Sequence, residues 1–330
     1  MSTRRLKFIS LALSALLVAL CAPADAQQAQ KVPRIGFLSL NPASVQKDRV
    51  EAFREALLKL GYVDGQNIKI EYRYADGKSD RLRELAAELV ALKVDVIVTT
   101  GNSATGPAKD ATKTIPIVMT NDSDPVGQGD IASLARPGGN ITGLSSVGFD
   151  LGDKRLELLK EIVPKLSRVA VLNDLTNRAA EVSGKEIDPT ARALKLQTQW
   201  FDLAKLEDFD GRFQAITKWR ADGLVTGGGP LMVRNRKRII EFAAKTKLPA
   251  IYTRPEFVDD GGLLSYSASI IDLTRRSAIY VDKILKGAKP ADLPVEQPIK
   301  FDFIINLKAA KQIDLTIPQS VLYRADKVIK

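Results

Sequence analysis

The chain has 330 residues, a formal net charge of +10, a single cysteine and no histidine. This length exceeds what one ordinary hydrophobic core holds and suits two domains. The lack of histidine removes Ser-His-Asp and Cys-His catalysis, together with the commonest protein ligand for zinc. This composition argues against hydrolase or zinc chemistry, and together with the patterns below it leads us to predict no catalytic residue, no metal and no cofactor.

The N-terminus has the three parts of a secretory signal peptide. Arg4, Arg5 and Lys7 precede an apolar run over residues 8–20, and Ala24-Asp25-Ala26 supplies a small-x-small cleavage site. The apolar run is too short for a transmembrane helix, which needs about 20 residues. We predict residues 1–26 to be removed and the mature protein to be periplasmic.

Lipid attachment at Cys21 is not expected, because Leu20 stands where a lipoprotein needs a small residue. The mature chain would then contain no thiol. In an exported protein, excess Lys and Arg favours solubility or contact with anionic solutes, and nucleic acid is not an expected partner. The basic run 234–238 is interpreted as the solvated face of a helix.

Strand and helix patterns alternate along the first half of the mature chain. The order predicts a parallel sheet with helices on both faces. The predicted elements are strands at 34–40, 67–74, 94–99, 115–120 and 141–145, and helices at 45–60, 79–92, 103–112 and 131–135.

The alternation then starts again, which predicts a second unit of the same type. Asp188-Pro189 is expected to kink or break one helix, and residues 290–298 are predicted to be a connector before an extra strand at 299–307. The remaining predicted elements are helices at 152–162, 179–194, 209–219, 231–245 and 273–286, and strands at 168–172, 197–201, 224–226, 250–252 and 263–266. The fold class is α/β, with two lobes facing each other.

Polar residues gather after two strands of the first half. Residues 101–105 follow one strand and open a helix, and residues 121–124 follow the next strand. Ligands bind at this edge of open α/β sheets, and a helix start suits a carboxylate. Asp122 and Asp124 offer negative charge for an ammonium group, so the combination suits a zwitterion such as an amino acid. The alternative is that the polar residues only cap the helix. P-loop, dinucleotide and EF-hand patterns are absent.

Several longer phrases resemble those of a known family. They are LGYVDGQNI at 60–68, RLRELAAELVALKVDVIVT at 81–99, LARPGGNITGLS at 134–145, KRLELLKE at 154–161 and YVDKILKGAKPADLPVE at 280–296. By these phrases the chain is similar, from about residue 31 to 329, to the extracytoplasmic substrate-binding proteins of ABC importers. The subgroup is the one that includes tryptophan-binding relatives.

The resemblance implies a type I periplasmic-binding-protein fold, in which two doubly wound parallel-sheet lobes joined by a hinge close on a solute. It implies an N-terminal lobe of residues 32–145 plus about 267–300 and a C-terminal lobe of 146–266 plus about 301–330. Crossovers are expected near 144–149, 266–270 and 300–307. The implied partners of a monomeric protein are a small solute, namely an aromatic or branched amino acid or related carboxylate, and a membrane permease with its ATPase.

Carried over to this sequence, the family's carboxylate site is the helix start at Asn102, Ser103, Ala104 and Thr105, with Asp124 near the ammonium group. The other residues predicted to bind the solute are Ser39, Asn41, Asp122, Asn173, Gly228, Gly229, Tyr252 and Tyr266. Each has a structural alternative: capping for the first two, a tight turn for the glycines, and core packing for the tyrosines.

Three functions are compatible with these patterns. We expect a passive receptor that delivers its solute to a permease. A sensory receptor of the same fold would share the site. An α/β enzyme would use Asp122 and Asp124 as an acid/base pair, but no activated nucleophile, phosphate loop or metal cluster accompanies them.

Overall fold

The computed structural model describes residues 32–146, 151–175 and 180–330, without the side chains of residues 180–186 and 230. The predicted signal peptide, Cys21 and part of the first expected crossover lie outside these residues. Within the described ranges, no helix has both the length and the hydrophobicity of a membrane-spanning segment.

The first lobe is built on a five-stranded parallel sheet of order β2-β1-β3-β4-β5. Its helices are α2, α3 and α4, and α11 from late in the chain packs against α2. The strands are β1 (Arg34–Ser39), β2 (Lys69–Tyr74), β3 (Val96–Thr100), β4 (Ile117–Asp122) and β5 (Ile141–Ser145). The helices are α2 (Ala43–Lys59), α3 (Arg81–Ala91), α4 (Asn102–Ala111) and α11 (Ile270–Leu285).

Both faces of this sheet are covered, because successive side chains of a strand point to opposite sides. In β1, Ile35 and Phe37 pack with α2 and α11, whereas Leu38 packs with α3 and α4. Val98 and Ile97 of β3 divide in the same way. Strands buried on both faces explain the short, continuous apolar runs in the sequence.

The second lobe has a seven-stranded sheet of order β12-β11-β10-β9-β8-β6-β7, in which only the β10–β11 pair is antiparallel. The strands are β6 (Arg168–Asp174), β7 (Gln197–Leu203), β8 (Gly223–Thr226), β9 (Ala250–Tyr252), β10 (Leu264–Ala268), β11 (Phe301–Asn306) and β12 (Lys327–Ile329). The helices are α5 (Gly152–Ile162), α6 (Ala180–Ala193), α7 (Asp208–Trp219), α8 (Pro230–Arg234), α9 (Arg236–Lys245), α10 (Pro255–Asp259), α12 (Leu307–Gln312) and α13 (Gln319–Leu322).

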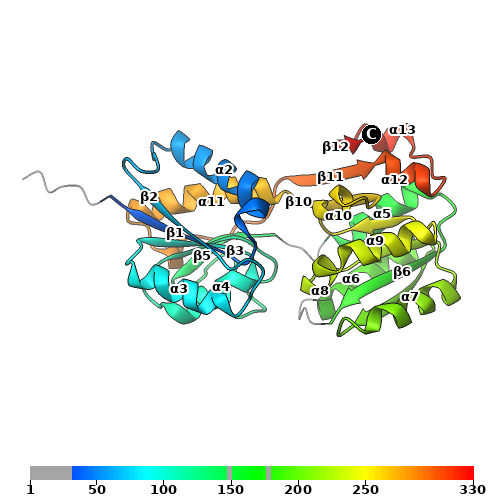
Figure 1. Cartoon of the computed structure of the whole chain (residues 1–330), viewed down its shortest axis with the longest axis horizontal. Coiled ribbons are helices and arrows are strands. Elements are labelled where there is room, and N and C mark those ends of the chain that lie inside the picture. The colour runs from blue at the N-terminus through cyan, green and yellow to red at the C-terminus, as the bar shows by residue number, and fades with distance from the viewer. Residues whose placement is uncertain (1–31, 147–150, 176–179) are drawn as a thin grey trace, which may run out of the picture.

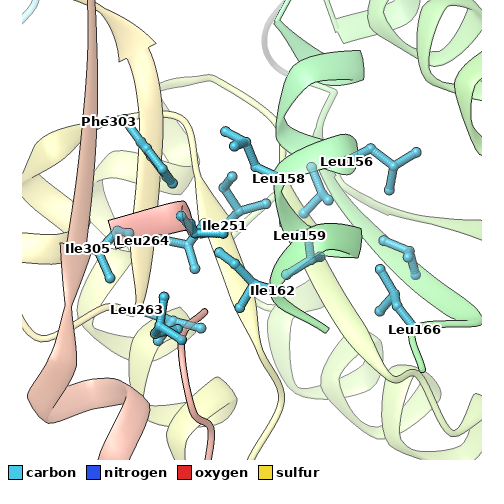
Figure 2. Packing of buried hydrophobic residues seen from close by; sticks show 14 of the residues in the cluster. Leu156, Leu158, Leu159, Ile162, Leu166, Ile251, Leu263, Leu264, Phe303 and Ile305 are labelled. Atoms are coloured by element: carbon cyan, nitrogen blue, oxygen red, sulfur yellow. The ribbon is translucent and has the colours of Figure 1, made fainter. Parts of the chain in front are cut away.

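Two clusters of buried apolar side chains lie on the two faces of this second sheet. On one face, α5 packs against the strands, and Figure 2 shows Leu159 and Ile162 lying beside Ile251 and Leu264. On the other face, α7, α9 and α10 cover residues such as Leu172. Each lobe therefore has its own core, and the predicted class of two doubly wound α/β lobes is confirmed.

The chain passes between the two sheets after β5, after β10 and before β11 (Figure 1). β5 continues toward α5 of the second lobe, so the carboxyl ends of its parallel neighbours face that lobe. β10 continues into α11 of the first lobe, so the carboxyl ends of β6, β8 and β9 face the first lobe in turn. Because ligands of open α/β sheets bind at carboxyl ends, the two candidate edges face each other.

Two predicted helices differ from the structure. The helix expected at 131–135 is absent, because its backbone bonds elsewhere: Ala132 N–H donates to Pro137 O, and Leu134 O accepts from Val295 N–H. The helix expected at 231–245 is two helices, since the Asn235 amide donates to Leu231 O at 2.9 Å and competes with the helical pattern. α6 runs through Pro189 without ending there.

Candidate functional site

The start of α4 presents free backbone donors. Gly101 precedes the helix with φ of 78°, a conformation that favours glycine, and its carbonyl accepts from the N–H groups of Ala104 and Thr105. The N–H groups of Asn102 and Ser103 make no hydrogen bond to a described residue, as expected for the first turn of a helix. Ser103 is exposed and Ala104 is buried. The arrangement suits an anion.

Asn102 ties this helix start to the loop after β4. Its Oδ1 atom accepts from the backbone N–H and the hydroxyl of Ser123, at 2.9 and 3.0 Å. Its Nδ2 atom is buried and has no partner among the described residues. The structure thus joins the two polar stretches that the sequence analysis had singled out.

Asp122 lies at the end of β4 and is fully buried. A bulge adds one residue to β4 between Met119 and Asp122, which changes the direction of the strand end beside the helix start. The bulge packs tightly on β5, since a Cβ at Gly143 would lie 2.2 Å from Met119 O.

Neither carboxylate oxygen of Asp122 accepts a hydrogen bond of good geometry from a described residue. Burial raises the pKa of Asp122 to about 7, and the neighbouring Thr105 hydroxyl offsets part of that rise. That hydroxyl is itself paired with Thr99 at 2.7 Å. A buried carboxylate without a donor is costly unless a cation completes the site.

Asp124 has a local structural partner instead. Its Oδ1 atom accepts from the backbone N–H of Gly127 at 2.8 Å, and a Cβ at Gly127 would collide with the carboxylate. The side chain therefore closes the turn after β4. Of the two aspartates predicted to meet an ammonium group, Asp122 is the one whose two carboxylate oxygens are both buried without a partner among the described residues.

Ser39 and Asn41 lie at the carboxyl end of β1, the strand next to β3 in the sheet. Ser39 Oγ is buried and accepts from Asn41 N–H at 3.1 Å and from Gln46 Nε2 at 2.8 Å. Gln46, which the sequence analysis missed, is fully buried and its Oε1 atom has no partner among the described residues. The available signal was a polar residue on the core-facing side of α2, in line with Phe53.

The second lobe contributes its own polar edge. Asn173 donates through Nδ2 to Asp202 at 3.0 Å, and its Oδ1 atom is buried without a partner among the described residues. Thr226 Oγ1, at the end of β8, is also buried without a hydrogen-bond partner among the described residues. Both residues line a cavity of about 20 Å³ together with Arg155, Gly227 and Gly228.

The glycine loop after β8 serves a tight turn around Asp174. Gly229 has φ of 143°, and a Cβ there would lie 2.2 Å from Asp174 Oδ2. The same oxygen accepts from Leu231 N–H at 2.9 Å. Gly228 alone of the two predicted glycines lines the cavity.

The two predicted tyrosines lie in the packed interior and the hinge. Tyr252 is 1% exposed and stacks on Phe257 with ring centroids 4.7 Å apart, so it belongs to the core. Tyr266 stacks on Phe301 at 5.7 Å, across the two strands that lead to the other lobe. Tyr252 is therefore better described as a core residue than as part of the wall of the site.

The sequence matches the model of one known family over most of its length. The model of the ABC transporter substrate-binding proteins matches residues 41–329. The chain belongs to this family. Proteins of this class bind small solutes for a membrane transporter. They act outside the cytoplasm. The family is one of substrate-binding proteins rather than enzymes.

Several relatives of this substrate-binding protein have known names or structures. It is 26% identical to a tyrosine-binding protein of Clostridioides difficile over 80% of this chain and 76% of that protein. It is similar to an ABC domain from Streptococcus pneumonia solved with L-Trp, with a TM-score of 0.80, 26% identity and coverage of 90% and 99%. A leucine-binding protein of Thermotoga maritima shares the fold, with a TM-score of 0.59 and 11% identity over 77% of this chain and 83% of that one. The fold is that of type I periplasmic binding proteins.

Proposed function

We propose that this protein is the periplasmic receptor of an ABC importer and traps an amino acid, of aromatic or branched type, between its lobes. The observation that carries the proposal is Asp122, a fully buried carboxylate that accepts no hydrogen bond of good geometry from a described residue, beside the open start of α4. The names of the tyrosine-binding and tryptophan-bound relatives support the same class of solute.

In this proposal the α-carboxylate of the solute accepts from the N–H groups of Asn102 and Ser103. The α-ammonium group pairs with Asp122. Both contacts are charge-assisted, which makes them about twice as strong as neutral hydrogen bonds. Pairing also removes the cost of a buried, isolated carboxylate. Ser39, Asn41, Gln46 and Asn173 are proposed as the surrounding polar wall.

Closure of the two lobes would then enclose the solute and present it to a permease and its ATPase. The ranges 32–145 with 267–300 and 146–266 with 301–330 are proposed as the two bodies of that movement. The signal-peptide pattern of residues 1–26 supports export, with the mature protein beginning at Gln27. From the family we propose that the mature protein is a monomer.

The test is a thermal-shift screen of the mature protein against amino acids, their amides, aromatic carboxylates, sugars and nucleosides. A ligand that binds only the folded state adds about 2.7 kcal/mol at a hundredfold excess over its dissociation constant. We expect a clear rise in the melting temperature with an aromatic or branched amino acid. A rise only with sugars or nucleosides would contradict the proposal.

A further inference from the structure

Arg155 is a buried cation in the second lobe, and no described carboxylate forms an ion pair with it. It lies in the first turn of α5 and is 4% exposed. Its Nε atom donates to the backbone oxygen of Tyr266 at 2.8 Å. A guanidinium has five N–H donors, yet no other side-chain hydrogen bond and no carboxylate within 4.0 Å is found for Arg155 among the described residues.

This placement is unfavourable for a positive charge in two ways. Burial removes water from the guanidinium and lowers the pKa of Arg155 to about 10, which still leaves it charged at neutral pH. The start of a helix carries partial positive charge, so a cation there is repelled. Buried charges are normally paired, and an anion at this point would satisfy both Arg155 and the helix.

Two acidic side chains at this end of β6 and β7 are committed to other partners. Asp202 accepts from Asn173, and Asp174 accepts from Leu231 N–H on the other side of β6. The bond to Tyr266 O holds α5 to the hinge strand, but it uses one donor and does not need a charge. A purely structural role therefore leaves most of the guanidinium unexplained.

Arg155 borders the small cavity at the strand ends. The cavity of about 20 Å³ has room for one water molecule or the tip of a small group. Thr226 offers a hydroxyl to it, and Trp200 forms part of its wall. The cavity lies at the carboxyl ends of β6 and β8, which is the edge that faces the first lobe.

The geometry points to Arg155 as the residue of the second lobe that recognises a carboxylate of the solute when the lobes close. The inference rests on the proposed function for the identity of the solute as an amino acid. It adds that the two lobes carry complementary charges, Asp122 in the first and Arg155 in the second, and that neither forms an ion pair with a described residue. In an aromatic or branched amino acid this is the α-carboxylate, which Arg155 would share with the start of α4; a solute with a second carboxylate on its side chain would present that one instead.

The first experiment uses formate, the smallest carboxylate, and needs no knowledge of the solute. The chain has two tryptophans, so Trp219→Phe leaves Trp200, in the cavity wall, as the emitter. We expect a saturable change of Trp200 emission with formate that weakens at least tenfold on adding Arg155→Gln. No saturable change, or an equal one in both variants, would overturn the inference.

The second experiment asks whether the carboxylate belongs to the solute. Affinities are compared for L-tyrosine with L-tyrosinamide and for L-glutamate with L-glutamine, in wild type and in Arg155→Gln. Loss of at least tenfold of the acid-over-amide preference in either pair identifies the carboxylate that Arg155 reads. A formate site that depends on Arg155, together with unchanged preferences in both pairs, would overturn the assignment and leave an adventitious ion only.

A matched control is Arg212→Gln in the same lobe. Arg212 is exposed and also donates through Nε to a backbone oxygen, that of Asp202 at 2.8 Å. We expect this control to leave formate binding unchanged. We also expect ligand-free Arg155→Gln to melt no lower than wild type, because it removes an unpaired buried charge; a large fall would assign Arg155 to structure.

The outcomes separate this inference from the proposed function. Amino-acid binding without an Arg155-dependent formate signal retains the proposed function and rejects the role of Arg155. An Arg155-dependent formate signal in a protein that binds no amino acid rejects the proposed function and limits the inference to an anion site.

Discussion

Arg49 of α2 and Glu256 of α10 form an ion pair between the lobes, with Nη2 and Oε1 3.0 Å apart. Both side chains are partly shielded, at 14% and 29% exposed. Arg254 stands nearby, at 3.9 Å from the same carboxylate oxygen. The pair stabilises the described arrangement of the lobes, so under the proposed trapping of a solute it biases the equilibrium between lobe arrangements.

Replacement of this carboxylate is expected to shift that equilibrium. Glu256→Gln should destabilise the described arrangement by about 0.5–1 kcal/mol, the upper part of the range for partly exposed pairs. The measurement is small-angle X-ray scattering of ligand-free protein, which reports the separation of the lobes. The control is Glu241→Gln, an exposed residue of α9. An unchanged profile in Glu256→Gln would mean that the pair does not hold the lobes.

The same pair predicts a response to acid. Burial raises the pKa of Glu256, but the attraction of Arg254 and Arg49 outweighs this and holds the pKa below its ordinary value. The stabilising contribution is therefore complete above the ordinary glutamate pKa of about 4.3 and is lost as pH falls through the lower folded value. We expect the lobe separation to be constant from pH 8 to 5 and to change below pH 4. Glu256→Gln should lack that acid transition.

Asp122 predicts a stability that falls as pH rises toward neutrality, the opposite of the dependence that Glu256 gives in acid. Its folded pKa of about 7 exceeds the unfolded value of about 3.9, so its contribution to stability is lost as pH rises through 7. Pairing with an ammonium group requires the ionised form, so affinity for the amino acid should rise between pH 5 and 7. Asp122→Asn should melt at least as high as wild type at pH 8 and bind at least tenfold more weakly.

The control for Asp122 is Asp124→Asn, whose amide oxygen still accepts from Gly127 N–H. Melting curves and titration calorimetry from pH 5 to 8 provide both readouts. Retention of wild-type affinity and pH dependence in Asp122→Asn would remove this residue from the site.

Ser103 allows the helix start to be blocked without disturbing the core. Its side chain is exposed, whereas Thr105 is buried and paired with Thr99, so only Ser103 accepts a large side chain freely. Ser103→Trp should abolish amino-acid binding with the melting temperature of the ligand-free protein nearly unchanged. Ser103→Ala keeps the backbone N–H groups and should bind within about threefold of wild type. Normal affinity in Ser103→Trp would place the carboxylate away from α4.

Much of the architecture could be predicted, because strands such as β1 and β3 are buried on both faces and read as short apolar runs. The joining of the stretches at 101–105 and 121–124 also followed from the strand order. The partners of single side chains could not be predicted. Asp124 accepts a hydrogen bond from the Gly127 N–H group, and Tyr252 stacks on Phe257. Neither contact has a signature in the local sequence.

Gln46 and Arg155 are candidate site residues that the sequence analysis did not select. Each stands in an ordinary amphipathic helix, where a polar residue near the first turn is unremarkable. Only the tertiary structure shows that both side chains are buried, Gln46 with an Oε1 atom that no described residue satisfies and Arg155 with no ion pair to a described carboxylate.

The most direct test of the amino-acid site is titration calorimetry with three forms of one aromatic solute: L-tryptophan, tryptamine without the carboxylate, and indole-3-propionate without the amine. If Asp122 and the start of α4 hold the two charged groups, L-tryptophan binds and each truncated form binds at least about 30-fold more weakly, equivalent to about 2 kcal/mol. Equal affinity for L-tryptophan and either truncated form would contradict the account.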